Sequence, residues 1–149
     1  MSSGEPVQAI EQKVRESFGR QAFMATLGAQ LTAAGPGTVE IRIPFSDKLT
    51  QQNGFLHAGV ITSILDSACG YAALSVAPEK AEVLSVEFKV NLLAPAVGES
   101  FIARAQVKRA GKTLTVCMAD AFALNQGNEK LVAMMQATIM NMIPQPHHV

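Results

Sequence analysis

The sequence predicts an α+β fold in which a curved antiparallel sheet wraps around one long central helix, with a further helix at the N-terminus. Three observations lead to this prediction. The stretch that follows Gln51 is small and apolar on nearly every side until the break at Pro78, as in a helix that is covered all round. Alternating strand-like runs joined by short loops come next, which favours antiparallel pairing. An amphipathic segment lies near the start of the chain.

Residues 1–30 form the predicted N-terminal helical segment. Within it, residues 5–18 carry apolar side chains at helical spacing: Val7, Ile10, Val14 and Phe18. Residues 21–31 are apolar and fit a second short helix that runs into a strand. The letters AAGPG at residues 33–37 predict a turn. A strand is predicted from Thr38, because Val39, Ile41 and Ile43 alternate with polar residues, and Pro44 ends it or confines it to a sheet edge.

Four more strands are predicted after the helix, over residues 83–93, 100–109, 113–124 and 131–143. In the first of them, one face carries Leu84, Val86, Phe88, Val90 and Leu92, and the other carries Ser85, Glu87, Lys89 and Asn91. The methionine-rich last run also fits a helix, but its place at the end of a meander favours a strand. We expect residues 143–149 to form a frayed tail, and residues 1–149 to form a single domain.

Composition narrows the range of partners. The 149 residues include 12 basic and 12 acidic side chains, so no charge excess points to nucleic acid or to a membrane surface. We expect no membrane-spanning run and no signal peptide. The two cysteines, Cys69 and Cys117, lie in apolar segments, which is typical of buried thiols in a reducing compartment. A cytoplasmic protein without a metal site or cofactor is therefore predicted.

One carboxylate stands out in the apolar helix. Asp66 is flanked by Leu65 and other apolar residues, and burial of an unpaired charge is costly. Its neighbours at helical spacing are small or weakly polar: Thr62, Ser63, Cys69 and Gly70. No lysine or arginine occurs between Gln51 and Pro78 to form a local ion pair. We interpret Asp66 as a catalytic carboxylate rather than a solvent-facing one.

The start of the same helix suggests a second functional group. Gly54, His57, Ala58 and Gly59 surround the point where the helix begins. The first backbone N–H groups of a helix have no partner within it, so they can bind the oxyanion of a tetrahedral intermediate. Ala58 and Asp66 are eight residues apart, or about 12 Å along the axis. If both act on one substrate, they must come from two subunits, so we expect a two-fold dimer with shared sites.

The stretch QQNGFLHAGVITSILD resembles a motif of hotdog-fold acyl-CoA thioesterases of the phenylacetic-acid-pathway type. That motif is Asn-x-x-Gly-x-x-His-Gly-Gly, followed by a helix that carries an acidic residue. The later SVEFKVNLLAPAVGE also resembles this family. The resemblance implies that Asp66 is the base or nucleophile, and that the N–H of Ala58, with that of Gly59, polarises the thioester carbonyl. It implies that His57 supports the loop or contacts the thioester region, and that Ser85 helps to place the attacking water.

Two positions depart from that motif: Ala58 replaces the first glycine after the histidine, and Gln51 stands where asparagine is usual. Asn53 lies two residues further on and is a second candidate for the asparagine role, in a loop that also holds Gly54. The expected substrate is an acyl-CoA, with Asn53 and Gly54 among the binding residues.

The basic residues Lys108, Arg109 and Lys112 cluster at a predicted hairpin, either as a solvated tip or as contacts for coenzyme A phosphates. Two other functions stay open: an acyl-thioester hydratase or dehydratase using His57 with Asp66, and a non-catalytic acyl-CoA binding protein. The apolar composition and exposed sheet edges also make a dimer of dimers a plausible assembly.

Overall fold

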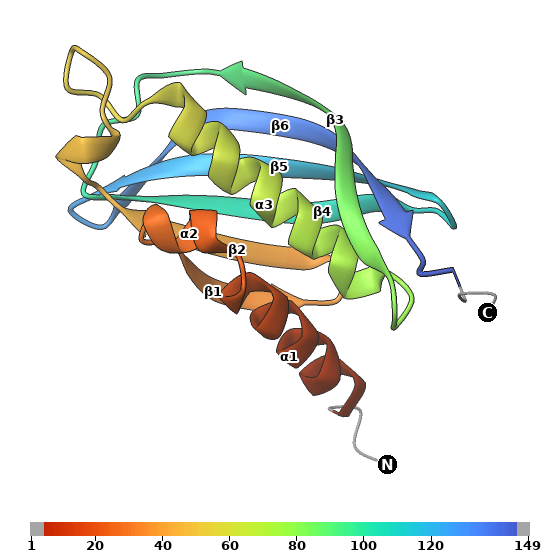
Figure 1. Cartoon of the computed structure of the whole chain (residues 1–149). Coiled ribbons are helices and arrows are strands. Elements are labelled where there is room, and N and C mark those ends of the chain that lie inside the picture. Colours follow the sequence, from red (N-terminus) through yellow and green to blue (C-terminus); the bar gives the residue numbers. More distant parts are fainter. Residues whose placement is uncertain (1–4, 146–149) are drawn as a thin grey trace.

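A computed structural model describes residues 5–145 of the chain. These residues form a curved sheet of six antiparallel strands with one long helix, α3, lying across its concave face (Figure 1). The strand order is β1-β2-β4-β5-β6-β3, so β1 and β3 are the two edges. The elements are α1 (Glu5–Gly19), α2 (Ala22–Thr26), β1 (Gln30–Gly35), β2 (Thr38–Pro44), the short 3₁₀ helix η1 (Asp47–Leu49), α3 (Ala58–Val76), β3 (Glu82–Leu92), β4 (Ser100–Ala110), β5 (Leu114–Asn125) and β6 (Asn128–Met142).

The predicted architecture of helix, sheet and N-terminal helix is confirmed. The predicted turn over residues 33–37 was too long, because Ala33–Gly35 belongs to β1 and pairs with β2. Only residues 36 and 37 form the turn, and Gly37 adopts the positive φ of 74° that such a tight reversal needs. Of the predicted tail over residues 143–149, residues 146–149 lie outside the described part of the chain.

The hydrophobic core lies between α3 and the concave face of the sheet. Large side chains from both layers are fully buried there, among them Ile61, Ile64, Phe101, Met135 and Ile139. By length and hydropathy α3 resembles a membrane-spanning helix, contrary to our expectation of no such run. Its apolar residues nevertheless pack against the sheet, as in the core helix of a globular domain.

The edge strand β3 contains a bulge that the sequence analysis missed. Ser85 pairs with Ile139 and Glu87 pairs with Thr138, so Val86 is an extra residue without a partner on β6. Opposite residues of antiparallel strands point to the same face, and Ile139 is buried beneath α3. Ser85 therefore faces α3, whereas Leu84 faces away from it. The prediction that Leu84 shares a face with Phe88 was wrong, because the bulge reverses the alternation.

Candidate active site

Asp66 lies in the middle of α3 on the side that faces β3. Its carboxylate is half-buried, and the hydroxyl of Ser85 donates a hydrogen bond of 2.7 Å to Asp66 Oδ1. The bulge at Val86 is what turns Ser85 towards the helix. Among residues 5–145, Asp66 takes part in no ion pair. The structure thus brings together two residues that the sequence analysis had singled out separately, and it leaves the negative charge of Asp66 without a cation.

A cavity of about 290 Å³ opens beside this pair. Hydroxyl and amide side chains from α1, from α3 and from the residue before α2 line it next to Asp66: Ser17, Gln21, Ser67 and Tyr71. Burial raises the pKa of Tyr71, whose ring packs edge-on against Phe18 at 5.7 Å. The sequence analysis did not identify these lining residues, because Ser17 and Gln21 reach the cavity only when the N-terminal helices pack against α3.

The first turn of α3 has one amide that is free to bind a ligand. His57 is the N-cap, and its Nδ1 accepts a hydrogen bond of 2.8 Å from the N–H of Gly59. The amides of Ala58 and Gly59 were predicted to polarise a carbonyl, and this bond occupies that of Gly59. Within the described residues, the N–H of Ala58 donates to no acceptor. Ala58 is therefore the better placed of the two predicted donors.

Glycine at position 59 leaves room for the same cap. A Cβ atom built there would lie 2.9 Å from Nδ1 of His57, closer than real side chains approach. The small residue thus lets the imidazole fold back over the helix end, and the loop-supporting role of His57 stays a prediction.

The loop before α3 holds the remaining predicted residues. The side-chain oxygen of Gln51 accepts a hydrogen bond from the N–H of Asn53, and Gly54 follows with a φ of 84°. Gln51 also lines a mainly apolar cavity of about 410 Å³ together with Ala58, while Asn53 is exposed. Gln51 is therefore nearer to the free amide than Asn53 is.

The two halves of the predicted site are separate within one chain. The cavity beside Asp66 and the cavity beside Ala58 share no lining residue. Eight helical residues also separate the two groups by about 12 Å along the helix axis. One thioester group is only a few ångströms long, so a single protomer cannot present both groups to it.

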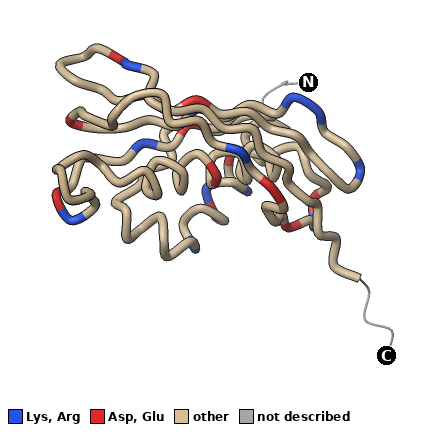
Figure 2. The backbone as a smooth tube through the Cα atoms, turned by 90° about the horizontal axis from the view of Figure 1, so that it is seen from above, with Lys and Arg blue, Asp and Glu red and all other residues tan. Residues whose placement is uncertain are grey.

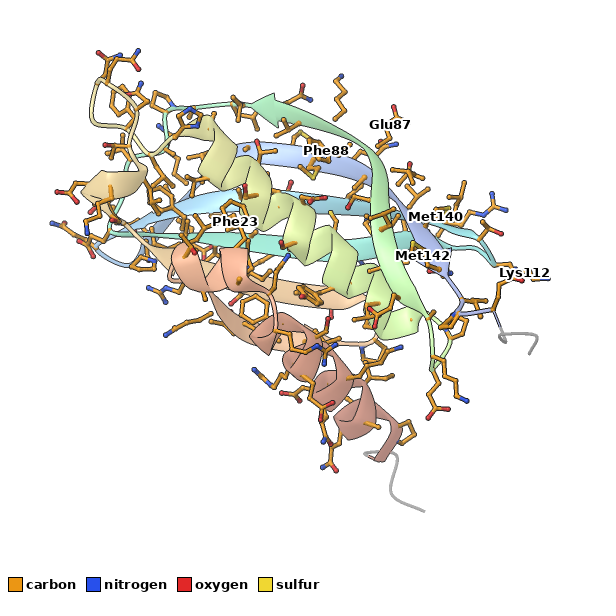
Figure 3. All side chains as sticks on the ribbon, in the orientation of Figure 1. Phe23, Glu87, Phe88, Lys112, Met140 and Met142 are labelled. Atoms are coloured by element: carbon orange, nitrogen blue, oxygen red, sulfur yellow. The ribbon has the colours of Figure 1, made fainter. Side chains whose placement is uncertain are left out.

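The basic residues Lys108, Arg109 and Lys112 are exposed around the β4–β5 hairpin. Lysine and arginine also occur elsewhere in the chain (Figure 2), and on the strands these residues are Arg42, Lys89, Arg104 and Lys130. Lys112 lies at the end of the sheet where β6 ends, and α3 begins at the other end of the sheet (Figure 3). These residues are not part of the cavity beside Asp66 or of the one beside Ala58.

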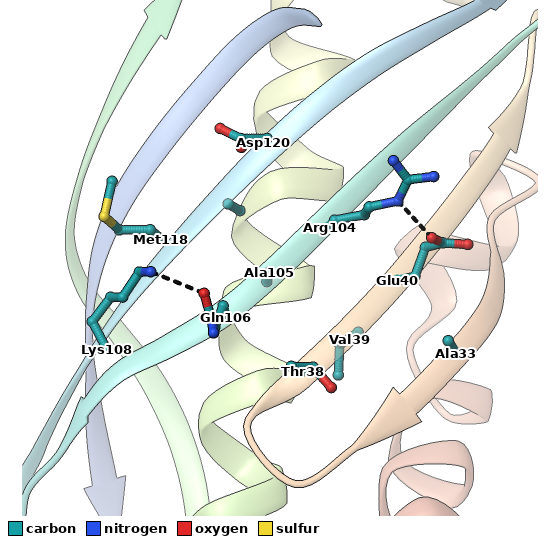
Figure 4. Close-up of a pocket in the computed structure, with 11 residues that line it drawn as sticks. Ala33, Thr38, Val39, Glu40, Arg104, Ala105, Gln106, Lys108, Met118 and Asp120 are labelled. Atoms are coloured by element: carbon teal, nitrogen blue, oxygen red, sulfur yellow. Dashed lines mark hydrogen bonds and ion pairs between the residues drawn. The ribbon is translucent and has the colours of Figure 1, made fainter. Parts of the chain in front are cut away.

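A further cavity, of about 480 Å³, lies on the convex face of the sheet, away from α3. Lys108 donates a hydrogen bond to Gln106 there, and Arg104 pairs with Glu40 at 2.8 Å (Figure 4). Arg104 also pairs with Glu129 at 2.6 Å. Burial alone would raise the pKa of Glu40, but hydrogen bonds from Arg104 and from a threonine outweigh it and lower that pKa. The hydrogen bond from Arg104 also lowers the pKa of Glu129.

A curved sheet around a central helix that carries a half-buried carboxylate defines the class of this molecule as a hotdog-fold protein with a candidate hydrolytic site. The family model for the thioesterase superfamily matches residues 53–130, which are just over half of the chain and include α3 and the Asp66–Ser85 pair. The chain belongs to this superfamily, and thioester hydrolysis is the general reaction that membership indicates.

Relatives agree with this assignment. A thioesterase family protein of Silicibacter pomeroyi is 56% identical, with a TM-score of 0.88, and the alignment covers 89% of this chain and 98% of that one. A candidate esterase of Halobacterium salinarum is 35% identical over 63% of this chain and 65% of its own length. The human protein named acyl-coenzyme A thioesterase 13 is 27% identical over 85% of this chain and 89% of its own length.

Proposed function

We propose that this protein hydrolyses acyl-CoA thioesters to a free acid and coenzyme A. The observation that carries the proposal is the carboxylate of Asp66, which has no cation partner among residues 5–145, accepts a hydrogen bond from Ser85, and lies beside a cavity. A carboxylate in this setting is available as a general base or as a nucleophile. The acyl-CoA part of the proposal draws on the name of the human relative, acyl-coenzyme A thioesterase 13.

In the general-base route, Asp66 takes a proton from a water molecule while the water oxygen attacks the thioester carbon. The carbonyl oxygen becomes an oxyanion, and the N–H of Ala58 stabilises it at the positive end of the α3 dipole. Collapse of the intermediate breaks the carbon–sulfur bond and expels the thiolate of coenzyme A. In the nucleophilic route, Asp66 attacks the carbon directly, the carbon–sulfur bond breaks with loss of the thiolate of coenzyme A, and water then hydrolyses the resulting anhydride.

The proposed active unit is a homodimer with two shared sites. Asp66 of one protomer would act with Ala58 of the partner subunit, since one chain separates these groups. Two such dimers would form the proposed tetramer. We also propose a cytoplasmic location, to which the two free, buried thiols are suited. The phenylacetic-acid-pathway subtype stays a prediction.

Hydrolysis of a panel of short, medium, long and aromatic acyl-CoAs tests the proposal, with thiol release as the signal. Wild type should cleave some members, and Asp66→Asn should cleave none while its unfolding curve stays cooperative. Asp120→Asn is the matched control, because this exposed carboxylate lies on the convex face of the sheet. Activity of Asp66→Asn close to wild type would refute the assignment.

The same assay distinguishes the alternative functions. A hydratase would add water to a crotonyl thioester without releasing thiol. This reading has less support, because Nδ1 of His57 already serves as the helix cap. A binding protein would retain acyl-CoA without turnover of any panel member.

Contacts between the hairpin and coenzyme A phosphates give a separate test. Replacing Lys108, Arg109 and Lys112 with glutamine should raise the KM for CoA esters, because attraction to the phosphates is lost. The KM for truncated thioesters without phosphates should stay the same. An equal effect on both substrates, or none on either, would remove these residues from the binding site.

A further inference from the structure

The cavity beside Asp66 has a polar end that the hydrolytic steps do not use. Its hydroxyl and amide groups belong to Ser17 and Gln21 at the N-terminal helices and to Ser67 and Tyr71 of α3. None of these four side chains carries a charge at neutral pH. An apolar acyl chain would displace water from them without replacing the lost hydrogen bonds, and each unpaired group would cost free energy. The polar end therefore suits a substrate with polar atoms of its own.

Gln21 holds the N–H group in this cavity that is free to bind a ligand. The residue is half-buried and lies directly before α2. Its Oε1 accepts a long hydrogen bond of 3.4 Å from the hydroxyl of Ser67, the residue that follows Asp66. Within residues 5–145, Nε2 of Gln21 donates to no acceptor, and it is not sealed from solvent. An amide nitrogen can only donate, so its missing partner is an acceptor such as an oxygen atom.

The charges around the cavity define the kind of oxygen atom that fits. Asp66 and Glu82 are the charged residues of its lining, and both are acidic. They would repel a second carboxylate on the acyl group. An ammonium group would be attracted to them, but it cannot accept a hydrogen bond from Gln21. A neutral hydroxyl or carbonyl oxygen satisfies both conditions.

The size of the cavity limits the length of the acyl group. Its volume is about 290 Å³. At about 30 Å³ for each molecule of liquid water, this volume corresponds to roughly ten water molecules. Pockets for drug-sized ligands are generally larger, at about 300–1,000 Å³. The cavity therefore suits a short acyl group better than a long chain.

The outer end of the cavity gives no binding partner for the phosphates of coenzyme A. There it meets a smaller cavity of about 170 Å³, because Ser17, Leu74 and Glu82 line both. The charged residues of the smaller cavity are three basic and three acidic ones: Lys13, Arg20, Lys80, Glu16, Glu79 and Glu82. A rim with balanced charges does not attract anionic phosphates. We therefore assign the polar cavity to the acyl group rather than to coenzyme A.

We propose that Gln21 determines substrate specificity, because its Nε2 donates a hydrogen bond to an oxygen substituent on the acyl group. The favoured substrates are then short acyl-CoAs that carry a neutral hydroxyl or carbonyl oxygen. This inference rests on the proposed function and names its substrate class. The family model begins at residue 53, so superfamily membership does not imply this contribution from the N-terminal segment.

Paired substrates test the inference with the full-length protein. The kcat/KM for 3-hydroxybutyryl-CoA or 4-hydroxybutyryl-CoA should exceed that for butyryl-CoA about 10-fold or more, because only an oxygenated acyl group keeps the polar end paired. Gln21→Leu replaces the amide with an apolar group of similar size. It should lower kcat/KM for the hydroxylated substrates and raise it for butyryl-CoA. Gln12→Leu is the matched control, since this exposed glutamine of α1 lines neither cavity, and it should keep the wild-type preference.

Binding measurements separate this inference from the hydrolase proposal. In the Asp66→Asn background the thioesters should stay intact, so calorimetry gives a Kd for each. The Kd of the hydroxylated thioesters should be about 10-fold lower than that of butyryl-CoA, and Gln21→Leu should remove the difference. Ser17→Ala, which takes one hydroxyl from the same polar end, should reduce the difference in the same direction. Cooperative unfolding of each variant shows that the fold is intact.

The outcomes distinguish the two proposals. Cleavage of butyryl-CoA and its hydroxylated forms with equal kcat/KM, or a preference that survives Gln21→Leu, would overturn the inference and leave the hydrolase proposal standing. A difference in Kd that depends on Gln21, without cleavage of any acyl-CoA by wild type, would support the inference and refute the hydrolase proposal alone. Failure of all these thioesters to bind would overturn both.

Discussion

Ser85→Ala is the substitution that tests the candidate active site most directly. It removes the hydrogen bond of 2.7 Å to Asp66 and keeps the size of the strand side chain nearly unchanged. A hydrogen bond to a charged group contributes about 1.5–3 kcal/mol. Because both residues are only half-buried, we expect the lower part of that range. If the carboxylate needs this bond to hold its direction in the transition state, kcat/KM should fall about 10- to 30-fold.

Steady-state hydrolysis of the best acyl-CoA in the panel measures this loss. Ser100→Ala is the matched control, since its hydroxyl accepts a hydrogen bond of 2.9 Å from Arg42, away from Asp66, and kcat/KM should not change. In the Asp66→Asn background, Ser85→Ala should cost little further activity, because the two residues act as a unit. A full additional loss in that background, or wild-type activity in the single variant, would refute the role of Ser85.

Three other predictions follow from the described contacts. Gly59→Ala should displace the His57 cap by steric contact and lower activity several-fold, and a wild-type kcat would show that the cap does not support the site. Burial raises the pKa of Cys117 to about 11, so the native protein should not react with a thiol reagent at pH 8 until denaturant exposes the thiol; rapid labelling would contradict the burial. Arg104→Gln should lower the free energy of unfolding at neutral pH and less so in acid. The ion pairs lower the pKa values of the two glutamate partners, so their contribution to stability is complete above the ordinary value of 4.5 and is lost as the pH falls through the lowered values. A difference in unfolding free energy from wild type that does not change with pH would argue against the ion pairs.

The sequence was sufficient to predict the architecture, because the strands alternate with a two-residue period and the central helix is apolar all round. The all-round apolar helix and the alternating runs leave few other arrangements, and the structure has the predicted sheet and helices. Asp66 could be selected because a carboxylate in an apolar stretch without nearby cations is costly to bury. These inferences depend on local chemistry, which the sequence displays.

Features set by tertiary contacts could not be predicted in the same way. The bulge at Val86 depends on how β3 pairs with β6, and nothing in the alternation of β3 itself marks it. The cavity beside Asp66 needs Ser17 and Gln21 from the N-terminal helices, which are 45 or more residues away along the chain. The cap on Gly59 depends on the direction of the His57 ring.

The extra residue in β3 acts like a change of reading frame for the two-residue repeat of the strand. Upstream of Val86 the odd positions face the helix, and downstream the even positions do. In a saturation mutagenesis scan of β3, polar residues should therefore be tolerated at Leu84 before the bulge and at Lys89 and Asn91 after it. They should not be tolerated at Val83 before the bulge or at Val90 after it. An alignment that places a gap elsewhere in this strand would assign the residue that contacts Asp66 to the wrong column.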